Sequence, residues 1–163
     1  MKTLNNFAYV SIDSYDGIRI IDLSNLPNFP TYKDTALGGL TTSHNLWIDE
    51  RGIMYVCGAN AVPGLMMFDL NADPWNPVLV GTYGDRYVHD VYVRNGLAYL
   101  SEINEGYLTV LDVSNPSNWV KLGQKTYSGA FTHNAWLNDA GTVCFTTDEY
   151  SGSIVRSWDV TDP

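Results

Sequence analysis

The sequence predicts an all-β fold, a segment of a β-propeller with about 3.5 to 4 four-stranded antiparallel blades of about 45 residues each. Three short motifs recur in a fixed order along the 163 residues. Each repeat divides into four short apolar runs joined by turns, and no stretch shows the 3.6-residue apolar period of a helix. Sheets that repeat in this way bury their faces against one another, as the blades of a propeller do.

The first motif is a strand that begins at a histidine. Its three copies are Ser43–Ile48, Val88–Val93 and Thr132–Leu137. Their histidines, His44, His89 and His133, are 45 and then 44 residues apart, and they are the only histidines of the chain. One repeat position therefore holds every imidazole.

Two further motifs complete the repeat. A second apolar strand follows a short polar turn that ends in glycine, which is a hairpin signal. A third apolar strand ends in an aspartate just before Ser, Asn or Pro, where a carboxylate commonly accepts hydrogen bonds from turn amides. The second motif reads Ala8–Ser11, Met54–Cys57, Ala98–Ser101 and Val143–Thr146, and the third ends at Asp22, Asp69, Asp112 and Asp159.

The motifs organise residues 1–163 as a single propeller segment, with blade units at about 1–43, 44–88, 89–132 and 133–163. We expect the chain to open inside a blade and to stop where the last outer strand should begin. This predicts an incomplete ring, or half of a ring that two copies close together. A single β-sandwich is the alternative, but sandwiches do not repeat three motifs in order at constant spacing.

Composition limits the partners. Nine basic and eighteen acidic side chains give a formal charge of −9, which repels nucleic-acid phosphates. No apolar run reaches the ~20 residues that span a bilayer, and the polar stretch Met1–Asn6 leads us to expect no export signal in the chain as given. Cys57 and Cys144 lie at different repeat positions, so we expect small buried apolar groups rather than a disulfide.

Propeller geometry predicts where the polar residues meet. The first strand of each blade lines the central channel, and the connection between the second and third strands lies on the same rim as the start of the first. This rim would collect the three histidines and the carboxylates of the connections. The expected residues at the channel mouth are His44, His89, His133, Asp90, Glu102, Asp148 and Glu149.

Three interpretations of the histidines remain open. They could be held by structural hydrogen bonds, as buried polar groups require. They could ligate a divalent metal, either zinc through His44, His89 and His133 or calcium through carboxylates and carbonyls. They could also serve acid–base chemistry, with Glu102, Asp148 or Glu149 as the base. We expect Trp47, Tyr92 and Trp136, three residues after each histidine, to pack between blades.

These motifs resemble those of LVIVD-repeat proteins, known especially as secreted bacterial choice-of-anchor B proteins. The resemblance is carried by Thr109–Pro116, Tyr87–Asp90 and Thr132–Leu137. It implies a propeller and an extracellular or cell-surface setting. It implies no particular reaction, because fold analogy does not establish an activity.

Two functions follow as hypotheses. The first is a non-enzymatic extracellular or surface module that binds protein or glycan, or associates with other blades or with a second copy. The second is a metal-assisted hydrolase or lyase at the channel mouth. The sequence contains no nucleophile elbow and no phosphate-binding glycine loop, which favours the binding module.

Overall fold

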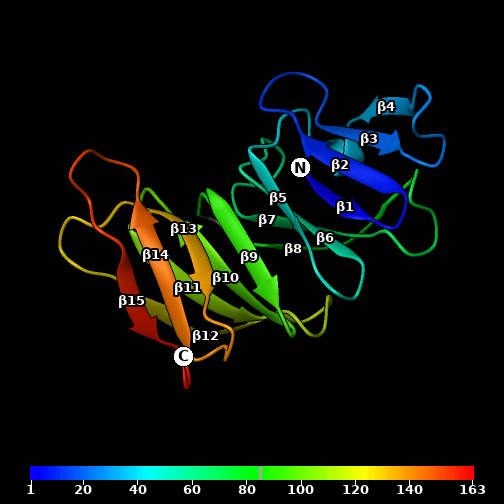
Figure 1. Cartoon of the computed structure of the whole chain (residues 1–163). Helices are drawn as coiled ribbons and strands as arrows, with labels where there is room; N and C mark the ends of the chain where they lie inside the picture. Colours follow the sequence, from blue (N-terminus) through cyan, green and yellow to red (C-terminus); the bar gives the residue numbers. More distant parts are fainter. Residues whose placement is uncertain (85) are drawn as a thin grey trace. The chain divides into compact units, whose positions relative to one another are not determined.

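The computed structural model describes residues 1–84 and 86–163, and within these residues it is built of short β-strands (Figure 1). The strands form four separate antiparallel sheets, and within each sheet every strand pairs with the next one along the chain. The first sheet contains β1 (Lys2–Leu4), β2 (Phe7–Ser11), β3 (Ile18–Asp22) and β4 (Thr31–Thr35), and the 3-10 turn η1 (Leu37–Gly39) follows it. The second sheet contains β5 (Asn45–Ile48), β6 (Ile53–Cys57), β7 (Leu65–Asp69) and β8 (Val78–Tyr83).

The third and fourth sheets repeat this plan. The third contains β9 (Asp90–Arg94), β10 (Leu97–Glu102), β11 (Tyr107–Asp112) and β12 (Val120–Lys125). The fourth contains three strands, β13 (Thr132–Leu137), β14 (Val143–Asp148) and β15 (Arg156–Asp159). The predicted all-β architecture of repeated antiparallel sheets is confirmed, and the sheets do not close on themselves.

The chain divides into two compact units, residues 1–85 and 86–163, each with two of the sheets. In the first unit, one apolar core joins the first two sheets. The first sheet supplies Tyr9, Ile18 and Ile20, and the second supplies Leu46, Met54, Val56, Met66 and Phe68. In the second unit, Tyr99, Leu100 and Val110 of the third sheet are buried, as are Ala135 and Cys144 of the fourth.

Local turn chemistry explains why the strands end where they do. Asn95 and Gly96 both adopt positive φ, 53° and 76°, between β9 and β10, which is the geometry of a two-residue hairpin turn. After the third strand of each sheet, an aspartate Oδ1 accepts a hydrogen bond from the amide two residues later. The four pairs are Asp22 with Ser24, Asp69 with Asn71, Asp112 with Ser114 and Asp159 with Thr161, at 2.8 to 3.0 Å. The predicted structural role of these aspartates is confirmed.

Strand register corrects one detail of the sequence alignment in the fourth sheet. Tyr99 pairs with Tyr92, and Tyr55 pairs with Trp47. In the fourth sheet the residue that pairs with Trp136 is Phe145, not Cys144. The turn before β14 is one residue longer than the turn before β6, so the expected alignment of Val143–Thr146 was wrong by one residue.

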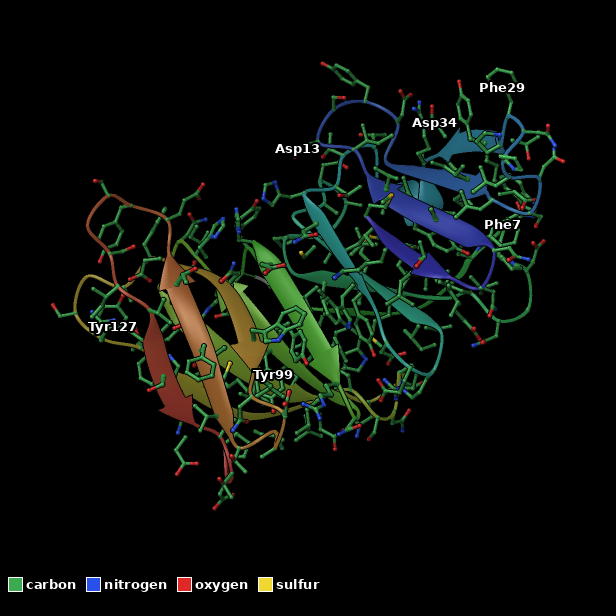
Figure 2. All side chains as sticks on the ribbon, viewed as in Figure 1. Phe7, Asp13, Phe29, Asp34, Tyr99 and Tyr127 are labelled. Atoms are coloured by element: carbon green, nitrogen blue, oxygen red, sulfur yellow. The ribbon has the colours of Figure 1, made fainter. Side chains whose placement is uncertain are left out.

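This register defines two faces on every sheet. We call the face that carries Tyr9, Tyr55, Tyr99 or Phe145 the aromatic face, and the other the opposite face. Tyr9 belongs to the core that the aromatic face of the first sheet makes with the opposite face of the second, represented by Met54 and Val56. In the second unit, burial raises the pKa of Tyr99, and the electrostatic influence of the nearby Cys144 thiol, on the opposite face of the fourth sheet, raises it further. Figure 2 labels Tyr99 in that unit.

No helix among the described residues has the length and apolar character that a bilayer crossing requires. Cys57 and Cys144 are free thiols and both are buried, which confirms that they act as small apolar groups. Burial raises the pKa of Cys144 to about 12, so its thiol is un-ionised and a poor nucleophile at neutral pH.

Candidate functional site

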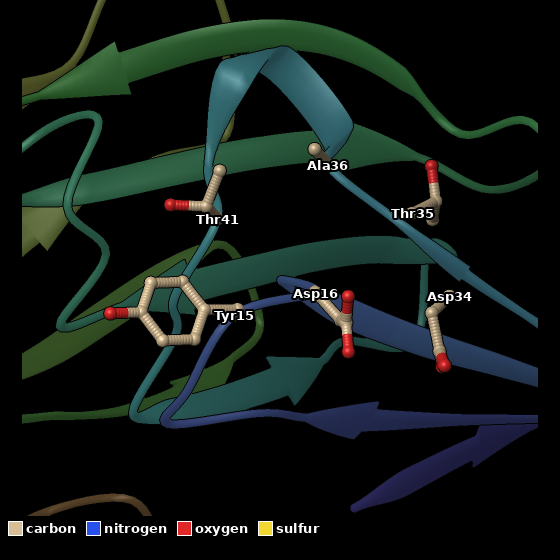
Figure 3. A pocket seen from close by; sticks show the side chains of 6 residues that line it. All are labelled: Tyr15, Asp16, Asp34, Thr35, Ala36 and Thr41. Atoms are coloured by element: carbon tan, nitrogen blue, oxygen red, sulfur yellow. The ribbon is translucent and has the colours of Figure 1, made fainter.

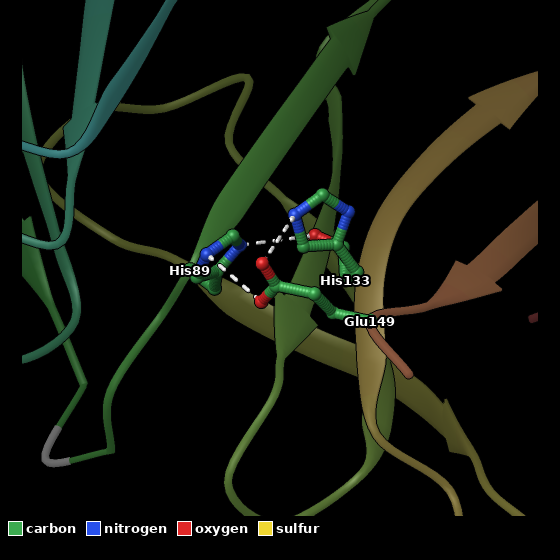
Figure 4. A group of neighbouring side chains, drawn as sticks. All are labelled: His89, His133 and Glu149. Atoms are coloured by element: carbon green, nitrogen blue, oxygen red, sulfur yellow. Dashed lines mark hydrogen bonds and ion pairs between the residues drawn. The ribbon is translucent and has the colours of Figure 1, made fainter. Parts of the chain in front are cut away.

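The second unit brings two of the three repeated histidines together with one carboxylate. The Nε2 atoms of His89 and His133 lie 4.0 and 3.9 Å from the two carboxylate oxygens of Glu149. The ring centroids of the two histidines are 4.6 Å apart. Figure 4 shows the three side chains pointing toward one another from three segments of the chain. We call these three residues the His–His–Glu cluster.

The repeat explains why these side chains meet. His89 directly precedes β9 and His133 lies in β13, so the equivalent strands of two neighbouring sheets present their imidazoles side by side. Glu149 follows β14, in the connection that the sequence places on the same rim. The β13–β14 register shifts between Thr132 and Asn134, which makes His133 the extra residue of a β-bulge. Bulges commonly re-aim a side chain in this way.

His44 occupies the same repeat position in the first unit but has a different partner. Its Nδ1–H donates to Oδ2 of Asp13, in the loop between β2 and β3, at 3.2 Å. Asp13 is one of the rim carboxylates that follow the second strand of a sheet. Within each unit, a repeated histidine therefore lies beside a carboxylate of the connection that follows a second strand.

Glu102 was predicted as a rim carboxylate, and the structure places it inside the second unit. It is only 2% exposed, and Arg86 Nη1 and Gln124 Nε2 each donate to its Oε2 at 3.4 Å. Burial raises the pKa of Glu102, while hydrogen bonds from Thr109 and Arg86 oppose the rise. Sequence reasoning missed Arg86, which lies three residues before His89 and outside every repeated motif.

Asp148 and Asp90 were also predicted at the channel mouth, and neither belongs to the His–His–Glu cluster. Oδ1 of Asp148 accepts a hydrogen bond from the amide of Phe131 at 3.1 Å, and its Oδ2 has no hydrogen-bond partner among the described residues. Asp90 is half-buried at the start of β9, where it pairs in register with Ser101. Both carboxylates lie next to cluster residues in sequence.

The aromatic residues that follow the histidines contact the neighbouring sheet, as expected. Nζ of Lys2, in β1, lies 3.6 Å from the ring centroid of Trp47 in the second sheet. In the second unit, the rings of Tyr92 and Trp136 are 4.6 Å apart. These contacts join the first strands of adjacent sheets within each unit.

A shallow pocket in the first unit is a separate candidate (Figure 3). It has a volume of about 260 Å³, and its lining includes Tyr15, Asp16 and Asp34. Asp34 is already bound through both carboxylate oxygens to Arg19, at 2.7 and 2.8 Å. The pocket is smaller than the ~300–1,000 Å³ typical of ligand sites, so it is the weaker candidate.

The His–His–Glu cluster has a donor set suited to a metal. Two imidazoles and one carboxylate ligate zinc and related transition metals, and three protein ligands leave one coordination position open. One ligand atom from each of the three residues lies within 4.8 Å of those of the other two.

Sequential antiparallel sheets stacked face on face within each unit define a protein built of propeller-type repeats. The family model described as the LVIVD repeat matches residues 2–33 and 85–124 of the chain. These two matches cover most of the first and third sheets. The second and fourth sheets carry the same turn aspartates in the same strand register.

A solved structure gives an independent comparison of the fold. A protein from Lactobacillus plantarum, a structural genomics target, superimposes with a TM-score of 0.58 over 93% of this chain at 12% sequence identity. The match covers 52% of that protein, so this chain spans about half its length. At this identity the likeness shows the fold alone. No curated protein matches the chain in sequence.

Proposed function

We propose that this chain is a non-enzymatic binding and assembly module of an extracellular or cell-surface propeller. Its first partner is a second copy of the chain. The observation that carries the proposal is the exposure of Phe145. At the equivalent position Tyr9 is 0% and Tyr99 1% exposed, whereas Phe145 is 41% exposed.

The two units stack their sheets by one rule. In the first unit the aromatic face of the first sheet packs on the opposite face of the second, through Tyr9 against Met54 and Val56. In the second unit the aromatic face of the third sheet meets the opposite face of the fourth, where Tyr99 neighbours Cys144. In both units, therefore, an aromatic face packs against the opposite face of the next sheet.

The fourth sheet offers such an aromatic face to solvent. Trp136 and Phe145 are cross-strand neighbours on it, and they are 56% and 41% exposed. Large side chains of this kind are normally buried when they lie side by side on a sheet, because exposure forgoes about 25 cal/mol per Å².

The first sheet carries the complementary surface. Its opposite face includes Ile21 and Tyr32, which pair in register across β3 and β4. Tyr32 is 59% exposed. We propose that the aromatic face of the fourth sheet in one copy packs on the opposite face of the first sheet in another, so that two copies associate by the contact that each unit already uses.

Light scattering coupled to size-exclusion chromatography tests this assembly. We expect the wild-type chain to elute as a dimer and Phe145→Lys and Tyr32→Lys each to elute as folded monomers, because either charge would be buried at the contact. Phe29→Lys is the matched control, since Phe29 is 94% exposed in the loop between β3 and β4 (Figure 2). A wild-type chain that is folded and monomeric at high concentration would refute the proposed assembly, as would an equal effect of Phe29→Lys.

The extracellular setting rests on the LVIVD repeats and on the resemblance to choice-of-anchor B proteins. Immunodetection of the native protein in culture medium, cell-surface and cytoplasmic fractions checks it. Detection confined to the cytoplasmic fraction would contradict this part of the proposal.

Metal-assisted hydrolysis, the alternative that the sequence left open, has weaker support. It needs a base beside the metal ligands. Glu102 is buried against Arg86, Asp148 accepts a hydrogen bond from the Phe131 amide, and Glu149 is itself a candidate ligand. The binding module is therefore the function that the geometry supports best.

A further inference from the structure

We infer that His89, His133 and Glu149 bind one divalent transition-metal ion of the zinc class, held within the second unit alone. This site goes beyond the proposed assembly, because it uses none of the residues of the aromatic face. It also narrows the metal site predicted from sequence, which included His44.

The protonation of His89 is fixed by its partner in a way that favours a metal. Its Nδ1 lies 3.2 Å from the backbone oxygen of His133. A carbonyl only accepts hydrogen bonds, so Nδ1 carries the proton and the neutral ring keeps a lone pair on Nε2. Metal-ligating histidines commonly donate their other ring N–H to a carbonyl or a carboxylate in this way.

Nε2 of His89 faces the other two ligands. Nε2 of His89 is 4.0 Å from one oxygen of Glu149, and Nε2 of His133 is 3.9 Å from the other. Both separations exceed the roughly 2.7–3.2 Å of a hydrogen bond, so the carboxylate is bonded directly to neither ring. The three groups converge on a common space (Figure 4).

That space has nearly the size that a metal ion requires. Bonds of about 2.0–2.2 Å in a tetrahedral site place ligand atoms about 3.4 Å apart. The two separations between an imidazole Nε2 and a Glu149 oxygen are wider than this by about half an ångström, and the three ligand atoms lie within 4.8 Å of one another. A rotation of Glu149 brings its carboxylate closer to the rings, and the two imidazoles must also approach each other slightly when the ion binds. The Glu149 side chain is 58% exposed and can make this movement, whereas that of His89 is 11% exposed and is held in place.

The donor set selects the class of ion. Calcium takes six to eight oxygen ligands, which this cluster does not supply. Two imidazoles and a carboxylate suit zinc and its neighbours among the transition metals, and the net charge of −9 favours cations in general. Three protein ligands leave a fourth position for water or for an anionic group of a binding partner.

Zinc titration of the full chain, first stripped with chelator and dialysed, tests the site by isothermal calorimetry. We expect one zinc ion per chain. His133→Gln should weaken binding at least about 100-fold and Glu149→Gln at least about 10-fold, because loss of outer partners alone costs about 10–100-fold. Both side chains are partly exposed, so these variants should fold even if a His89 variant does not.

Two controls keep the result specific. Asp139→Asn removes one exposed carboxylate from the turn between β13 and β14, at the other end of the fourth sheet, and should leave affinity within about two-fold. His44→Ala removes the equivalent imidazole of the first unit and should also leave it unchanged. Cobalt(II) is a second probe, whose visible absorption should appear with the wild-type chain and vanish with His133→Gln.

The outcomes decide the inference. Saturable binding at one equivalent that depends on His133 and Glu149 supports it. Absence of saturable zinc binding, unchanged affinity in His133→Gln, or an equal loss in His44→Ala would overturn the assignment to these three residues. Oligomeric state does not enter this measurement, so it stands apart from the test of assembly.

Discussion

Glu102 shows how burial changes the chemistry of a single carboxylate. It is nearly inaccessible beneath Arg86 and Gln124, and burial raises its pKa. The Glu102 carboxyl group therefore keeps its proton to a higher pH in the folded chain than in the unfolded chain, where the pKa of a glutamate is about 4.3. Ionisation of Glu102 between these two pKa values favours unfolding.

Glu102→Gln removes this ionisation, so a comparison with the wild type isolates the contribution of Glu102 to the pH dependence of stability. As the pH rises from about 4 toward about 7, we expect the melting temperature of the wild type to fall relative to the variant. Thermal melts of both proteins across this range measure the difference, with Glu105→Gln, an exposed neighbour, as the control. A constant difference at every pH would show that burial does not penalise the Glu102 charge.

The stacking of the sheets makes a quantitative prediction for individual strands. Tyr99 and Phe145 occupy the same register position, but Tyr99 is 1% and Phe145 41% exposed. Truncation of a buried aromatic residue costs about 3–5 kcal/mol, and we expect Tyr99→Ala to fall in this range. Phe145→Ala should cost about 1–2 kcal/mol, because less of its surface leaves water on folding.

Urea denaturation measures both values. It is best carried out in a Tyr32→Lys background, so that dimer formation does not add to the apparent stability. Equal losses for the two substitutions would mean that the aromatic face of the fourth sheet is covered within the monomer, contrary to the 41% exposure of Phe145 in the structure.

Most strands and turns could be predicted from the sequence, and the predictions that were wrong have identifiable physical causes. The hairpin turns and the turn aspartates are local, so their residue types alone predict them correctly. The register of β14 depends instead on its pairing with β13. Cys144 and Phe145 are both apolar, and alternation cannot tell which of them follows the one-residue insertion in the preceding turn.

For the candidate site, too, the sequence predicts repeat positions but not the contacts that depend on strand pairing. Equal spacing placed His89 and His133 at one repeat position, and they do meet. The bulge at His133 and the contact of Arg86 with Glu102 depend on pairing between strands, which no motif records. His44 follows the repeat but pairs with Asp13, so equivalence in sequence did not imply a shared partner.

At the scale of the whole molecule, net charge opposes the proposed association. Each copy carries a formal charge of −9, so two copies repel one another at low ionic strength. The Debye length falls from about 30 Å at 0.01 M salt to about 8 Å at 0.15 M, which screens this repulsion while leaving apolar burial intact. An apolar contact between like-charged copies should therefore tighten as salt is added.

Sedimentation equilibrium at low and at physiological sodium chloride measures this dependence. We expect the dimer dissociation constant to fall by roughly ten-fold over that range, since screening removes about 1–1.5 kcal/mol of repulsion between two such bodies. Phe145→Lys should remain monomeric at both concentrations, because added salt does not remove the cost of burying its ammonium group. Association that weakens with salt would instead identify ion pairs as the source of affinity, and the aromatic face of the fourth sheet would then not be the contact that joins the copies.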